Sequence, residues 1–112
     1  DVVTNFMKKF NHTCIIKQVP ACIMNDNSLK INNTGNPGLA TAGTGDVLSG
    51  IVASFISQGI DYYDAASLAV FIHGQASDLA ANKLGYRGQL STDIIKYIPI
   101  VISSYEALQT SI

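Results

Sequence analysis

Residues 33–50 have the sequence NTGNPGLATAGTGDVLSG, in which a glycine-rich segment runs directly into an apolar repeat. From Val47 to Ile56 the apolar residues recur at helical spacing, and Gly59 is placed to end that helix. Glycines let the backbone approach a ligand closely and adopt positive φ. Successive amides, together with the first turn of a helix, attract an anion. The pattern therefore predicts a phosphate-binding loop that opens a helix.

Asp46 follows the last glycine of this loop directly. One interpretation makes it the helix N-cap, whose carboxylate accepts amide hydrogen bonds from the first turn. The other makes it a general base that takes a proton from a substrate hydroxyl beside the phosphates. The two roles are compatible. The loop lacks the Gly-Lys-Ser/Thr end of a Walker A motif and the spacing of a dinucleotide-binding fingerprint.

The segment before the loop predicts one helix and three strands. Apolar residues at helical spacing predict a helix over 2–10, and a β-branched run over 13–17 predicts a buried strand of a mostly parallel sheet. Strands over 21–25 and 29–32, separated by turn residues, predict a hairpin. Pro20 places this hairpin toward one edge of the sheet.

The segment after the loop predicts helices only. Asp61 or Asp64 is placed to cap a helix that ends at Gly85. A short helix up to Ile95 and a separate final helix with Pro99 in its first turn follow. The order of elements predicts the α/β class, and the few strands indicate the C-terminal part of one domain over residues 1–112, with its upstream part absent.

The composition excludes several classes. Of the 112 residues, 47 % are hydrophobic and 13 % charged, which is typical of one globular domain. A net charge of −1 gives no electrostatic footprint for nucleic acid or an acidic membrane, and no apolar stretch is long enough for a membrane span. Cys14 and Cys22 lie in apolar segments, which favours buried free thiols and a cytoplasmic location.

Residues 33–50 closely resemble the signature of the NAD(P)H-hydrate dehydratases, the YjeF C-terminal type of the ribokinase-like superfamily. The resemblance extends to residues 71–81 and 90–95 and reaches nearly to Pro99. It implies a ribokinase-like fold, here with a partial central sheet and a hairpin flanked by helices. The long run from Asn36-Pro37-Gly38 to Asp46 is specific to the family, whereas Gly-Thr-Gly-Asp alone fits many ribokinase-like kinases.

The resemblance implies a repair enzyme that uses a nucleotide to remove water from hydrated NADH or NADPH. The substrate hydroxyl is phosphorylated, and elimination restores the dihydronicotinamide ring. Asp46 would be the catalytic base and bind substrate together with Asn36, while Gly43, Thr44 and Gly45 would form the anion hole. The residues between Leu39 and Gly43 resemble those of the bacterial members, which use ADP rather than ATP. Mg²⁺ is expected to bridge the phosphates.

A second segment of the family touches the nucleotide with a strand that ends in Lys-Gly and a few small residues. Lys17 matches the lysine, and the positions after it are Gln18, Val19, Pro20 and Ala21. Gln18 departs from the usual glycine, so a side chain stands where the nucleotide is expected. Taken without the resemblance, Lys17 is an ordinary solvated lysine at a strand end.

Other polar residues are weaker candidates. His73 lies on an apolar helix face and is interpreted as a core histidine, and Arg87 as a solvated loop residue. Asp78 and Asp93 are interpreted as helix-surface or capping residues. Two other functions remain open: a small-molecule kinase of the same superfamily, and a non-catalytic nucleotide-binding fragment. We expect a homo-oligomer, and no turnover from residues 1–112 alone.

Overall fold

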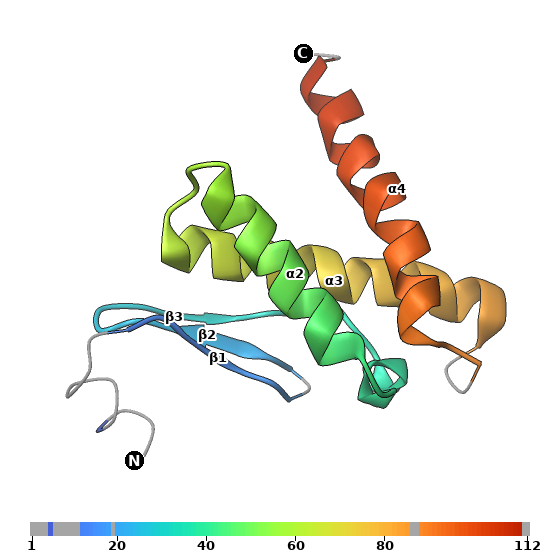
Figure 1. The fold of residues 1–112 in the computed structure, drawn as a ribbon, viewed down its shortest axis with the longest axis horizontal. Coiled ribbons are helices and arrows are strands. Elements are labelled where there is room, and N and C mark those ends of the chain that lie inside the picture. Colours follow the sequence, from blue (N-terminus) through green and yellow to red (C-terminus); the bar gives the residue numbers. More distant parts are fainter. Residues whose placement is uncertain (1–4, 6–11, 19, 86–87, 111–112) are drawn as a thin grey trace.

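The computed structural model describes residue 5 and residues 12–18, 20–85 and 88–110. The helix expected over 2–10 falls almost entirely outside these residues. Figure 1 shows a small sheet followed by three long helices. The elements are β1 (Cys14–Ile16), β2 (Cys22–Met24), β3 (Leu29–Ile31), the short 3-10 helix η1 (Pro37–Ala40), α2 (Thr44–Ser57), α3 (Tyr62–Leu84) and α4 (Ser91–Thr110).

The three strands form one antiparallel sheet in the order β1-β2-β3. The expected hairpin is confirmed, with Met24 paired with Leu29 beside the turn. In the turn, Asn25 Oδ1 accepts hydrogen bonds from the amides of Asn27 and Ser28 at 3.0 and 2.7 Å. Within the described residues β3 is an edge strand, as the sequence predicted.

The expectation that residues 13–17 form a buried strand of a mostly parallel sheet is wrong. β1 pairs antiparallel with β2, and its side chains are half-buried. A parallel pair requires a crossover of about a dozen residues or more, whereas residues 17–21 leave room only for a tight return. The apolar character of this strand therefore accompanies partial burial of all three of its residues.

The faces of the sheet differ in what covers them. Ile15, Ile23 and Lys30 are aligned across the strands, and Ile23 joins the core with Leu48 of α2 and Val70 of α3. On the opposite face Leu29 and Ile31 are 56 % and 64 % exposed. The described helices therefore lie on one side of the sheet, as Figure 1 shows.

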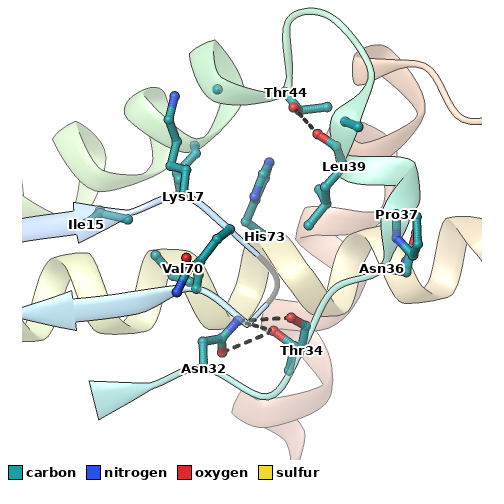
Figure 2. A pocket seen from close by; sticks show the side chains of 15 residues that line it. Ile15, Lys17, Asn32, Thr34, Asn36, Pro37, Leu39, Thr44, Val70 and His73 are labelled. Atoms are coloured by element: carbon teal, nitrogen blue, oxygen red, sulfur yellow. Dashed lines mark hydrogen bonds between the residues drawn. The ribbon is translucent and has the colours of Figure 1, made fainter. Parts of the chain in front are cut away.

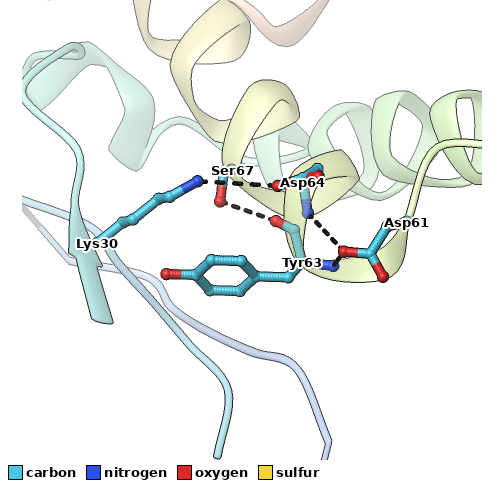
Figure 3. A network of polar contacts seen from close by, with 5 residues as sticks. All are labelled: Lys30, Asp61, Tyr63, Asp64 and Ser67. Atoms are coloured by element: carbon cyan, nitrogen blue, oxygen red, sulfur yellow. Dashed lines mark hydrogen bonds and ion pairs between the residues drawn. The ribbon is translucent and has the colours of Figure 1, made fainter. Parts of the chain in front are cut away.

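The start of α3 is fixed by capping and by the hairpin. Asp61 Oδ2 accepts hydrogen bonds from the amides of Tyr63 and Asp64 at 3.2 and 3.4 Å, which confirms Asp61 as the N-cap. Lys30 Nζ lies 3.9 Å from Asp64 Oδ1 and 4.7 Å from the centre of the Tyr63 ring (Figure 3). β3 is thus tied to the first turn of α3, and Gly85 ends the helix at φ +76°.

The region expected to hold two helices around Pro99 is one helix, α4, with Pro99 inside it. Proline in a helix interior removes one hydrogen bond and costs about 3 kcal/mol. Ile94 and Val101 are buried on either side of the proline, in one core cluster with Ile72 and Ala76 of α3. Because this packing holds both halves of α4 on α3, the helix continues through the proline. None of the described helices is long and apolar enough to cross a membrane.

Candidate functional site

The glycine-rich loop is a compact structure built on η1. Asn36 caps η1, and its Oδ1 accepts the Gly38 amide hydrogen bond at 2.8 Å. Thr44 Oγ1 donates to the Leu39 carbonyl oxygen at 2.6 Å, so the end of η1 is held against the start of α2. Gly43 is the N-cap of α2 at φ +89°, where a side chain would be strained. A turn followed directly by a helix start was predicted here and is present.

Asp46 lies in the first turn of α2 and is exposed. Its interpretation as the N-cap is wrong, because α2 begins at Thr44 and Gly43 occupies the cap position without a side-chain hydrogen bond. The glycine provides the positive φ that the chain needs to enter the helix, which starts the helix earlier than the apolar repeat indicated. A carboxylate in the first turn still interacts favourably with the helix dipole and remains available to a ligand.

Lys17 lies beside the start of the same helix. A Cβ placed on Gly45 would stand 3.0 Å from Lys17 Nζ, so the ammonium group lies directly over that glycine. First-turn amides of a helix have no acceptor within the helix and carry its positive end. The structure therefore brings together two predicted parts of the nucleotide site, the lysine that follows β1 and the glycine loop, in an arrangement suited to an anion.

A cavity of ≈330 Å³ opens between the sheet, the loop and α3, and Figure 2 shows its side chains. Lys17, Thr44 and His73 line it, together with Asn32 and Thr34 from the segment after β3. Its walls are otherwise largely apolar, formed by Ile15, Ala21, Leu39, Leu48 and Val70. A mostly apolar cleft with a few convergent polar groups is typical of a small-molecule site.

Of the remaining residues in the predicted nucleotide segment, some line the cavity and others do not. Gln18 and Ala21 line the cavity, whereas Pro20 is exposed and Val19 lies outside the described residues. The Gln18 side chain is exposed, and its Nε2 lies 3.6 Å from Cys22 Sγ. This contact draws the amide toward β2. Cys14 and Cys22 are free thiols, half-buried rather than buried.

His73 is buried, as expected for a core histidine, but it also lines the cavity. Its Nε2 is buried and has no hydrogen-bond partner among the described residues. Burial lowers the pKa of His73 from its ordinary value, and an interaction with the Thr44 backbone opposes this only in part. The ring is therefore neutral at physiological pH.

A buried polar cluster beneath η1 was missed by the sequence analysis. Asn36 Nδ2 donates to Ser77 Oγ at 3.0 Å and to Asp78 Oδ1 at 2.8 Å. Asp78 Oδ2 accepts from the Gly35 amide at 3.1 Å, so both oxygens of Asp78 hold the loop on α3. Gln89 completes the cluster from the segment before α4. The available signal was the polar pair 77–78, which stands between the apolar residues Ala76 and Leu79 of α3.

Asp78 is therefore more than a helix-surface residue, since it clamps the loop. Asp93 does have the expected capping role, because its Oδ2 accepts from the Leu90 amide at 2.9 Å. Arg87 lies outside the described residues. Among the described residues no three His, Cys, Asp or Glu side chains cluster as a metal site. A Mg²⁺ ion held mainly by nucleotide phosphates needs only one or two protein carboxylates. Asp46 is an exposed carboxylate at the loop.

Comparisons with known proteins point to one family. The sequence model described as NAD(P)H-hydrate dehydratase matches residues 1–100. A bifunctional NAD(P)H-hydrate repair enzyme from Moorella thermoacetica is 44 % identical over 81 residues, covering 72 % of this chain and 15 % of the relative. The ADP-dependent (S)-NAD(P)H-hydrate dehydratase of Xanthomonas campestris is 33 % identical over 103 residues, covering 91 % of this chain and 36 % of the relative.

The fold is also matched by a solved structure. The ADP/ATP-dependent NAD(P)H-hydrate dehydratase of Bacillus subtilis, co-crystallised with ATP and Mg²⁺, superposes with a TM-score of 0.86 at 23 % identity. The match covers 93 % of this chain and 38 % of that one, and it confirms the expected ribokinase-like α/β fold. The chain thus spans well under half the length of each of these relatives.

Proposed function

The chain belongs to the NAD(P)H-hydrate dehydratase family, and we propose that the protein containing it repairs hydrated NADH or NADPH by ADP-driven dehydration. The observation that carries this proposal is the convergence of Lys17 Nζ on Gly45 at the start of α2. Two independent anion-binding groups, an ammonium group and a helix N-terminus, meet there. The terminal phosphate of the nucleotide would lie between them. The matched relatives of the family are named for this reaction.

The chemistry assigned to this chain is proton removal beside the phosphate. The substrate hydroxyl oxygen forms a bond to the terminal phosphorus of ADP, AMP leaves with the electron pair, and Asp46 accepts the hydroxyl proton. Elimination of the phosphate, together with a proton from the neighbouring ring carbon that passes to solvent, then restores the double bond of the dihydronicotinamide ring. The exposed position of Asp46 in the first turn of α2 leaves its carboxylate open to an incoming hydroxyl.

The binding roles divide between the two segments. Lys17 and the residues 18–21 would contact the nucleotide, and residues 43–45 would surround the transferred phosphate. Mg²⁺ would neutralise charge on the phosphates, with Asp46 as the nearby carboxylate. Asn36 is proposed to bind substrate. Because its side chain already bonds Gly38, Ser77, Asp78 and Gln89, it would act mainly through its fixed position in the loop.

The test is to incubate the full-length protein with ADP and hydrated NADH and to follow the recovery of absorbance near 340 nm. Asp46→Asn should abolish recovery while ADP still binds, because the amide cannot take the proton. Asp26→Asn, in the exposed hairpin turn, is the matched control and should leave the rate unchanged. Undiminished turnover in Asp46→Asn would remove Asp46 from the mechanism.

The same assay separates the two alternatives. A flat absorbance while an added alcohol is phosphorylated would identify a small-molecule kinase of the superfamily. Binding of ADP without either reaction would identify a nucleotide-binding protein. A cytoplasmic location and a homo-oligomeric assembly complete the proposal; the free thiols of Cys14 and Cys22 support a reducing compartment.

A further inference from the structure

His73 has an unusual position for a core residue. It is 6 % exposed, and within the part of the chain that the structure describes its buried Nε2 has no hydrogen-bond partner, although the ring lines the cavity. A buried polar atom left unpaired costs about 1–3 kcal/mol. Figure 2 shows His73 projecting from α3 into the cavity, on the side where Lys17 and Thr44 also lie. A ring nitrogen that is unpaired among the described residues, on a ring that lines a cavity, is suited to pair with a ligand there.

The cavity itself indicates what kind of ligand fits. Lys17 and the start of α2 at Thr44 and Gly45 form its cationic end, where a phosphate is favoured. Ile15, Leu48 and Val70 provide apolar walls, which suit a flat ring and not a second charged group. A neutral imidazole in this setting offers one hydrogen-bonding nitrogen without adding a charge.

We propose that His73 is a ligand-binding residue whose Nε2 forms a hydrogen bond to the nitrogen heterocycle of a bound nucleotide, with the phosphates of that nucleotide at Lys17 and Gly45. The inference rests on the proposed function for the presence of a nucleotide. The shared chemistry is a flat, nitrogen-containing ring joined to phosphate. Two sources supply it, the adenine of ADP and the nicotinamide ring of the substrate.

Binding measurements on the full-length protein separate ring recognition from phosphate recognition. Isothermal titration would give the Kd of ADP, of reduced nicotinamide mononucleotide, and of pyrophosphate, which has the phosphates and no ring. His73→Leu should raise the Kd of one of the two nucleotides by about tenfold, which corresponds to the loss of one hydrogen bond. It should leave pyrophosphate within about twofold, because Lys17 and Gly45 are untouched.

Two further variants distinguish the loss of a ligand contact from a purely structural effect. His73→Gln retains a polar side chain and should restore part of the lost affinity. His12→Gln, at an exposed position outside this cavity, should leave the Kd of all three ligands unchanged. In the unaltered protein labelled with ¹⁵N-histidine, the nucleotide should shift the Nε2 resonance of His73, and pyrophosphate should not.

The outcomes are distinct. Weakened ADP binding supports the proposal with adenine as the ring, and weakened mononucleotide binding supports it with nicotinamide. Unchanged affinity for both nucleotides in His73→Leu, or a His73 resonance that neither nucleotide moves, overturns it. These are binding measurements, so a failure of the dehydration assay would refute the proposed function without deciding this result.

Discussion

Replacing Gln89 by methionine tests how the glycine loop is held on α3. The Gln89 side chain is 1 % exposed, and its Oε1 accepts from Ser77 Oγ at 2.8 Å. Its Nε2 donates to Asn36 Oδ1 and to the Ser77 carbonyl, both at 3.2 Å. Methionine is unbranched and of similar length, so Gln89→Met removes these three bonds without opening a large cavity.

The magnitude follows from which groups are left unpaired. Asn36 Oδ1 keeps the Gly38 amide at 2.8 Å. The Ser77 hydroxyl proton loses its acceptor inside a buried cluster, which costs the desolvation of that group as well as the bond. A hydrogen bond contributes about 0.5–1.5 kcal/mol and an unpaired buried group costs about 1–3 kcal/mol. We expect Gln89→Met to lower the free energy of unfolding by about 2–4 kcal/mol.

Urea denaturation of the full-length protein, followed by circular dichroism, measures this change. Gln58→Met makes the same chemical change at an exposed position, where Gln58 Nε2 donates to Ser54 Oγ at 3.2 Å. The control should shift stability by less than about 0.5 kcal/mol. If the two variants lose the same stability, the buried cluster does not hold the loop and the reasoning is refuted.

Gly74→Ala should lower stability by about 1–3 kcal/mol in urea denaturation, because the added Cβ would stand 2.7 Å from the Thr34 carbonyl carbon. At Gly50 an added Cβ would meet nothing within 4 Å, so Gly50→Ala should instead raise stability by about 0.5–1 kcal/mol. Equal effects of the two alanine substitutions would contradict this difference in packing. Asp61→Ala should cost about 1 kcal/mol through loss of the α3 cap, and an unchanged urea midpoint would exclude that role. Burial lowers the pKa of His73 from 6.5, so between the two pKa values the unfolded chain binds a proton that the folded chain does not. Stability should therefore fall as the pH drops below 6.5 toward the lower folded pKa. His73→Gln should flatten this slope, measured as the unfolding midpoint against pH.

Much of the loop could be predicted because it is a local structure. Glycine at positive φ, an apolar repeat of helical spacing and a capping aspartate act within a few residues. The turn before α2 and the helix itself were therefore predicted correctly, and Asp61 is one of the two caps that the sequence offered for α3. The same local reasoning misplaced Asp46. The helix starts at Thr44, ahead of the apolar repeat, because Gly43 alone makes the entry turn.

Long-range packing decided what local signals could not. Pro99 is a strong breaker by itself, but α4 continues through it because Ile94 and Val101 are both buried with α3. β1 is apolar enough for a strand covered on both faces, yet the short return to β2 makes the pair antiparallel. In each case the free energy of packing or the length of a connection outweighs the residue's own preference.

The amino-acid sequence alone determined that the glycine-rich loop of residues 36–46 opens a helix, because glycine conformation and helix periodicity are local properties. Only the tertiary structure placed Lys17 over Gly45, since β1 and α2 meet through the core and not along the chain. It also turned His73 toward the cavity with Nε2 unpaired. Whether a polar side chain is paired within the core or left facing a ligand depends on neighbours far apart in sequence, and residue type does not encode that.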